Sequence, residues 1–132
     1  MSRPLLTATT ERVGRHMVVR VVGEVDISTA PIMDTALAEG TAAPASPDAL
    51  IVDLTEVRFF GSSGLSVLIA AHSRGCDVGV PLIVVVPRTG VVRRAVELTG
   101  VDHLVTVVET VEDALSPDGL RGPHRSAPDG RC

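Results

Sequence analysis

The sequence predicts a single α/β domain, with a mixed, mostly parallel sheet of four to five strands and about four helices. Its 132 residues fit one domain that can bury a real core. Short aliphatic runs alternate with helical patterns along the chain, an order typical of an α/β layer structure. Hydrophobic residues make up 45% of the chain and aromatic residues only 2%, so the predicted core is aliphatic.

Four segments have the composition of strands, and a fifth is a weaker candidate. The clear ones are residues 18–22, 50–54, 82–86 and 104–108, and the weaker one is residues 5–10. The segments at 50–54 and 82–86 are nearly continuous apolar runs, which are typical of strands covered on both faces. Residues 41–48 are rich in proline and alanine and are predicted to form a surface loop.

Two longer helices are predicted between these strands. The first covers residues 28–39, where Ser28 is a candidate N-cap and a proline follows in the first turn. The second covers residues 63–74 and is expected to end at Gly75. Helical spacing places four of its side chains on one face, namely Leu65, Leu68, Ile69 and His72.

Two shorter helices are predicted in the second half of the chain. Residues 91–98 form one that stops before Gly100, and residues 111–115 form the other. From residue 116 to 132 the chain is polar, with repeated proline and glycine and no apolar periodicity. We therefore expect a folded domain over residues 1–115 and a disordered tail over 116–132.

Composition excludes several classes of function. The net charge of −4 provides no basic patch for nucleic acid. All 12 basic residues are arginine, so a Schiff-base lysine or a P-loop lysine is impossible. The longest apolar run, residues 80–86, is far shorter than the ~20 residues that span a bilayer, and no signal peptide pattern is present. A cytoplasmic protein without nucleic-acid or membrane partners is expected.

Catalytic arrangements find little support in the sequence. A nucleophile elbow needs glycine two residues before and two after its serine, but Ser63 has Gly61 before it and Leu65 after it. A phosphorylated receiver domain could use Asp53 at a strand end, but it also needs a lysine that this chain lacks. No catalytic residue is therefore predicted.

Cofactor and metal sites are likewise not predicted. Residues 23–26 lack the glycine pattern that binds dinucleotides. His72 and Cys76 are four residues apart on a predicted helix, but one such pair is a poor metal site. We expect no cofactor and no metal.

Two adjacent serines, Ser62 and Ser63, stand where a strand passes into a helix. One interpretation is an N-cap, worth ~1 kcal/mol relative to alanine. The other is reversible phosphorylation, which adds about −1.5 to −2 charge near the positive end of a helix dipole. The two are compatible, because Ser63 can cap the helix while Ser62 is modified.

Three segments resemble the STAS domain of anti-sigma factor antagonists. Residues 53–65, DLTEVRFFGSSGL, resemble the central signature of this family. Residues 23–30, GEVDISTA, resemble its G-E-L/I-D segment, and residues 91–104, VVRRAVELTGVDHL, resemble its late helix. The resemblance covers about residues 5–115 in the expected order.

The resemblance implies a mixed five-stranded sheet and a protein without enzymatic activity. Soluble bacterial members bind anti-sigma factors that are also GHKL-type serine kinases, and thereby release a sigma factor. The kinase modifies the first serine of the motif, which by position is Ser62, with Ser63 as second choice. A PP2C-type phosphatase reverses the reaction. Gly61 stands where the family usually has an acid, which removes a carboxylate beside the modified hydroxyl.

The predicted partner-binding residues come from two segments expected at the same end of the sheet. They are Glu24, Asp26, Ser28, Gly61, Ser62, Ser63, Gly64 and Leu65. An alternative is that Ser28 caps the first helix while the two acids are solvated. A second function also fits the family: a STAS scaffold, or a subunit of a signalling or lipid-transport complex, without a phosphorylation switch. A small enzyme is a distant third.

Overall fold

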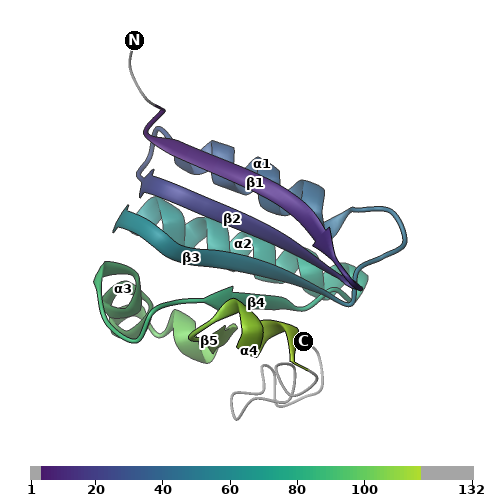
Figure 1. The fold of residues 1–132 in the computed structure, drawn as a ribbon. Helices are drawn as coiled ribbons and strands as arrows, with labels where there is room; N and C mark the ends of the chain where they lie inside the picture. Colours follow the sequence, from purple (N-terminus) through teal and green to yellow (C-terminus); the bar gives the residue numbers. More distant parts are fainter. Residues whose placement is uncertain (1–3, 117–132) are drawn as a thin grey trace.

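The computed structural model describes residues 4–116, which form one five-stranded sheet flanked by helices (Figure 1). Its strands lie side by side in sequence order: β1 (Leu6–Val13), β2 (His16–Val25), β3 (Ala49–Phe60), β4 (Leu82–Val85) and β5 (Thr106–Val108). β1 is antiparallel to β2, and the remaining neighbours are parallel. The predicted mixed, mostly parallel sheet is confirmed. Except for its first residue, the predicted tail lies outside the described residues.

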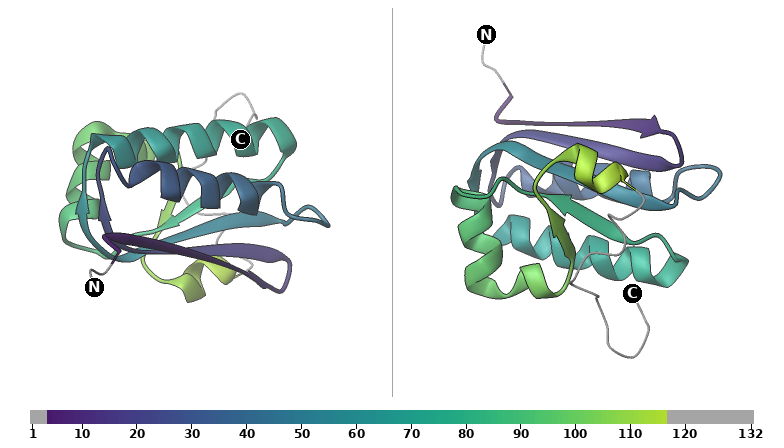
Figure 2. Two further views of the ribbon diagram at one scale, coloured as in Figure 1. Left: turned by 90° about the horizontal axis from the view of Figure 1, so that it is seen from above. Right: turned by 60° about the horizontal axis from the view of Figure 1, so that its bottom comes forward.

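Helices lie on both faces of the sheet. α1 (Ala30–Thr41) and α2 (Ser62–Val78) cover one face, and α4 (Val111–Leu115) lies on the other (Figure 2). α3 (Val91–Thr99) is followed by a short 3-10 helix, η1 (Val101–His103). The larger core cluster lies under α1, α2 and α3 and is almost entirely aliphatic, as predicted, while a smaller cluster lies under α4. Burial of each large aliphatic side chain stabilises the fold by about 1.5–3 kcal/mol.

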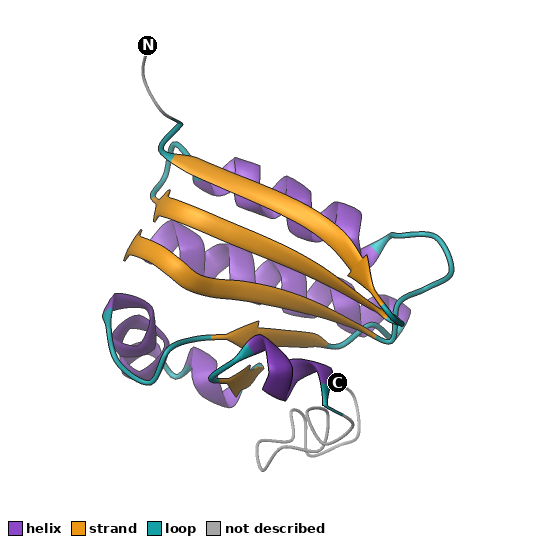
Figure 3. Ribbon diagram, viewed as in Figure 1, coloured by secondary structure: helices purple, strands orange, loops and turns teal. Residues whose placement is uncertain are grey.

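β3 is much longer than its predicted apolar run, and its second half lies beyond β4. β4 pairs with β3 only as far as Asp53, so residues 54–60 have a strand partner on one side only, β2 (Figure 3). α3 packs against β3. Because of this extension, the carboxyl end of β3 lies beyond the end of β4. The start of α2, which follows directly, is positioned there.

α2 does not end at Gly75 as predicted. The helix continues to Val78 and ends at Gly79, which has the left-handed φ of 77°. Gly75 is buried, and a Cβ there would lie 2.2 Å from the carbonyl oxygen of Val80. This glycine therefore serves a close backbone approach.

The apolar face of α2 is also rotated from the predicted one. The helix buries mostly small residues toward the sheet, namely Gly64, Val67, Leu68, Ala71 and Gly75. Ile69, predicted on the buried face, is 42% exposed. Small residues allow the helix to approach the sheet closely, and periodicity that counts only large side chains does not detect such a face.

Candidate functional site

The carboxyl ends of β2 and β3 meet at one edge of the sheet. Val25 lies opposite Phe60, and the Gly61 N–H donates a hydrogen bond of 3.0 Å to the Val25 carbonyl. Since Gly61 alone separates β3 from α2, the start of α2, which begins with the serine pair, lies beside the loop that follows β2 (Figure 1). The structure therefore brings the two predicted segments together.

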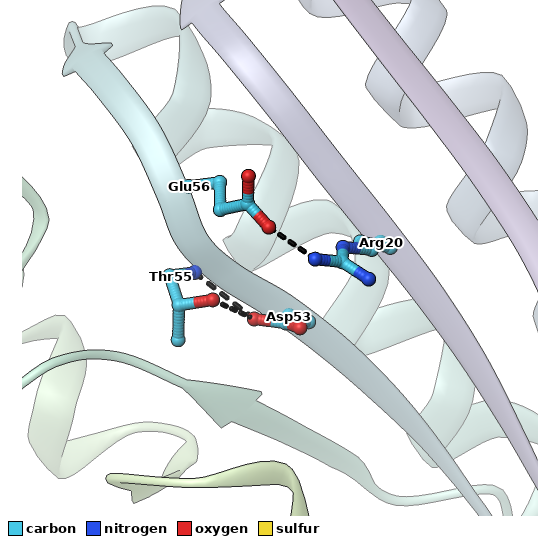
Figure 4. Close-up of polar contacts among 4 residues, drawn as sticks. All are labelled: Arg20, Asp53, Thr55 and Glu56. Carbon is cyan, nitrogen blue, oxygen red and sulfur yellow. Dashed lines mark hydrogen bonds and ion pairs between the residues drawn. The ribbon is translucent and has the colours of Figure 1, made fainter.

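Asp53 does not lie at this edge, because it is within β3 and not at its end. The register between β2 and β3 shifts just beyond Arg20, where β3 contains an extra residue. The Asp53 carboxylate accepts hydrogen bonds from the Thr55 N–H at 3.0 Å and the Thr55 hydroxyl at 2.7 Å (Figure 4). Arg20 forms an ion pair with Glu56 nearby. Asp53 thus supplies an acceptor to the backbone at the bulge.

Ser62 and Ser63 both lie inside the first turn of α2. The N-cap is Gly61, with extended backbone angles (φ −89°, ψ −174°), and no side chain caps the helix. The predicted serine cap is therefore wrong: Gly61 is held by its bond to Val25, so the helix begins one residue earlier. Ser62 is exposed and Ser63 is half-buried. The uncapped N–H groups and the helix dipole favour a negative charge here.

A dense hydrogen-bond network fixes the loop between β2 and α1. The Asp26 carboxylate accepts from the Ser28 hydroxyl at 2.8 Å, the Ser28 N–H at 2.9 Å and the Thr29 N–H at 3.0 Å. The Ser28 hydroxyl above all, together with these N–H groups, holds the pKa of Asp26 below its usual range. The Thr29 hydroxyl donates to the Glu24 carbonyl at 2.7 Å.

This network corrects the roles expected of the loop residues. The N-cap of α1 is Thr29 and not Ser28, and the helix begins at Ala30. Ser28 is exposed and bonded to Asp26, whose carboxylate is already used within the loop. Asp26 therefore rigidifies the loop, and its charge is only partly available to a partner.

The loop presents an exposed apolar side chain that the sequence did not single out. Ile27 is 84% exposed, at the tip of the rigid loop. Beside it lies a shallow groove of about 430 Å³ between α1 and α2, lined by Ile27, Ala30, Pro31, Asp34, Ser63, Ser66, Val67 and Ala70. An ion pair of 3.0 Å between Asp34 and Arg74 joins the two helices. Only the folded chain shows this groove, since its walls come from separate helices.

The two glycines of the motif have different structural reasons. A Cβ on Gly64 would lie 2.6–2.9 Å from three ring atoms of the buried Phe60, so this position requires glycine for packing. A Cβ on Gly61 would meet the ring of Phe59 at 3.3 Å, and the backbone there suits any residue. Leu65 is half-buried and packs against the core. A side chain fits at Gly61 if the exposed Phe59 ring shifts by a few tenths of an ångström, whereas at Gly64 it would require the buried Phe60 ring to move.

Gly61→Asp, which introduces a carboxylate at the N-cap of α2, is expected to raise the free energy of unfolding by about 0.5 kcal/mol. The carboxylate would accept from first-turn N–H groups and interact with the helix dipole. Urea denaturation measures the change. Gly61→Ala adds the same Cβ without an acceptor and is expected to be less stable than the wild type. Equal stabilities of the two variants would contradict this assignment of Gly61 as an unoptimised N-cap.

Two kinds of feature, a membrane-spanning helix and a metal-ligand cluster, are not found among the described residues. Within residues 4–116, no helix is long and apolar enough to cross a membrane. In the same range, no group of three or more His, Cys, Asp or Glu side chains is arranged to hold a metal ion. The candidate site is the edge formed by the loop, Gly61 and the start of α2, which the hydrogen bonds and the groove described above define.

The fold and this edge define an α/β module with a serine-bearing helix start beside a rigid loop. Residues 7–114 match the STAS domain family, and the chain belongs to that family. The anti-sigma-F factor antagonist RsfB of Mycobacterium tuberculosis is 39% identical over 105 residues, which are 80% of this chain and 81% of RsfB.

Solved structures agree with this assignment. The crystal structure of an anti-sigma factor antagonist from Mycobacterium paratuberculosis superimposes with a TM-score of 0.76 and 35% identity, over 87% of this chain and 96% of that one. SpoIIAA in its unphosphorylated form gives a TM-score of 0.64 at 23% identity, over 88% of this chain and 97% of that one. The second similarity shows the shared fold.

Proposed function

We propose that this protein is a cytoplasmic, non-enzymatic anti-sigma factor antagonist. It binds an anti-sigma factor that carries a GHKL-type serine kinase domain, and binding releases a sigma factor. The similarity to RsfB, named as an anti-sigma-F factor antagonist, supports this role. The observation that carries it is the exposed Ser62 at the start of α2, held beside a rigid loop with an exposed apolar tip.

The proposed partner surface is the edge built from two segments. Loop residues around Asp26 and Ser28 and the first turn of α2 form its polar part, and Ile27 with the α1–α2 groove forms its apolar part. A central apolar contact with a polar rim is the usual anatomy of a specific interface. Glu24, Gly64 and Leu65 support this surface mainly through backbone bonding and packing.

Phosphorylation of Ser62 is the proposed switch. In the free protein, the dipole of the 17-residue α2 and its uncapped N–H groups stabilise the added charge. In the complex, the same phosphate would be desolvated against the partner, at a cost of several kcal/mol. The penalty therefore falls on binding and not on folding, and a PP2C-type phosphatase resets the protein.

Incubation with the cognate kinase and ATP is expected to label a single serine, and Ser62→Ala is expected to abolish that labelling. Ser63→Ala is the matched control and should still be labelled, because Ser63 is half-buried. Phosphopeptide mapping identifies the modified residue. Labelling that persists in Ser62→Ala would overturn the site. Failure of the unphosphorylated protein to bind any such kinase would overturn the function.

A further inference from the structure

The outer edge of β1 is free of any strand partner within the described chain, because β1 pairs only with β2. The Glu24 N–H donates to the Leu5 carbonyl at 2.9 Å, which fixes the alternation of hydrogen bonds along this antiparallel pair. It follows that Leu6, Ala8 and Thr10 direct their N–H and carbonyl groups away from β2. Three residues thus present six backbone groups to a further strand.

Residues 6–10, the first part of this edge, lack the features that normally prevent strand addition. Exposed edges are usually protected by charged residues, proline or bulges. Residues 6–10, LTATT, contain no charge and no proline, and their register with β2 is regular. Beyond them, the Arg12 side chain donates to the Pro44 carbonyl, so the loop before β3 contacts β1 near the end of the strand.

A groove of about 480 Å³ runs beside this edge, between β1 and α1. Ala8 and Thr10 line it from the strand, and Pro31, Ile32, Thr35, Ala36 and Glu39 line it from the helix. Ile32 is 48% exposed there. A single extended peptide would occupy the strand edge but leave the outer side of α1 uncovered. A partner that brings both a strand and a helix would cover both.

We propose that this edge is a homodimer interface in which β1 pairs with β1 of a second copy. The strands run antiparallel about a two-fold axis that passes midway between the two copies of Ala8, so that Ala8 faces its own copy and Leu6 faces Thr10. In this register all six outward backbone groups on each chain form hydrogen bonds. Glu11 and Arg12 then fall opposite the uncharged residues at positions 5 and 4, so no like charges meet.

The position of α1 favours a second copy over any other strand. α1 packs on β1 and β2 and also contacts β3. Because neighbouring strands are about 4.8 Å apart, the two α1 helices would lie roughly 10–13 Å apart across the axis, which lets their outer side chains meet. Their outer residues, centred near Thr35, would then face one another.

Charge complementarity supports the same arrangement. Glu39 lies in the last part of α1, where a negative charge is unfavourable to its own helix dipole. The first turn of α1 contains no acidic residue. In the antiparallel pair, Glu39 of each copy approaches the first turn of the other α1. The Glu39 charge, which is unfavourable at the end of its own helix, therefore gains a favourable interaction with the positive end of the other α1.

Sedimentation of the full chain is expected to give a species of twice the 13.8 kDa chain mass at a concentration of about 100 µM. Hydrogen exchange provides an internal control. The Ala8 amide should become more protected as concentration rises, whereas the Thr9 amide, already bonded to β2, should not change. A mass of 13.8 kDa at this concentration would overturn the proposal. The same mass is expected if β1 binds an extended peptide and not a second copy, so that alternative would also overturn it.

Thr35→Arg is expected to raise the dimer dissociation constant at least about tenfold, because two arginines would meet near the axis. Ser73→Arg places the same side chain on an exposed position of α2 and should leave dimerisation unchanged. Thermal melts verify that both variants fold. A dimer that Thr35→Arg leaves intact uses another surface, and that result would also overturn the proposal.

Discussion

Ser62→Asp is expected to weaken binding of the anti-sigma factor by about 100-fold or more, while the domain remains at least as stable as the wild type. The exposed Ser62 is the first residue of α2, where a carboxylate interacts favourably with the helix dipole. The same charge must be desolvated when the partner covers this turn. Titration calorimetry measures the affinity, and thermal unfolding measures the stability.

Ser73→Asp is the matched control for charge on α2. It lies on an exposed position near the other end of the helix, and we expect its affinity to stay within about twofold of the wild type. Ser62→Ala should bind like the wild type, since the hydroxyl itself is small and has no required partner. If Ser62→Asp binds as tightly as Ser62→Ala, charge at this position does not control the interaction.

Gly23→Ala is expected to lower the free energy of unfolding by about 3 kcal/mol or more, the largest stability effect anticipated in this domain. Gly23 has a φ of 121°, which side chains rarely adopt, and it lies at a register shift between β2 and β3. An added Cβ would be 2.1 Å from the Leu5 carbonyl oxygen, a backbone atom that cannot move without breaking β1 pairing. Urea denaturation provides the measurement.

Gly14→Ala is the control that separates the cost of a positive φ from the cost of the steric overlap at Gly23. Gly14 has a φ of 61° in the turn between β1 and β2, and nothing lies within 4 Å of its added Cβ. Only the left-handed backbone penalty applies there, about 1 kcal/mol. Equal losses at the two positions would show that the overlap with Leu5 relaxes freely. That result would contradict the expected cost of the overlap at Gly23.

The sequence predicted the order of strands and helices well because aliphatic runs and helical periodicity report directly on burial. It missed the length of β3. Two register shifts interrupt the alternation of buried and exposed residues after Asp53. The sequence pattern of a strand is therefore lost there, although pairing with β2 continues to Phe60. The end of α2 was missed for a different reason. Gly75 serves a backbone approach that only the tertiary structure reveals.

The candidate site was predicted in position but not in detail. The motif located Ser62 and its neighbours, and parallel strands placed them beside the loop after β2. Neither signal could show that the Asp26 carboxylate is already bonded to Ser28 and Thr29. Nothing in the sequence singled out Ile27. Its exposure depends on how the loop folds, and the groove beside it depends on two helices.

The one-residue connection between β3 and α2 has a consequence for how a signal could be transmitted. Gly61 is hydrogen-bonded to Val25 on its strand side, and Gly64 is packed against Phe60 on its helix side. A group added to Ser62 therefore has no flexible loop beside it whose conformation it could change. We expect the unmodified and modified proteins to have the same backbone conformation. They would then differ only in the charge and shape of the surface at Ser62. A partner would then distinguish the two forms by direct contact with Ser62, without a conformational change elsewhere in the domain.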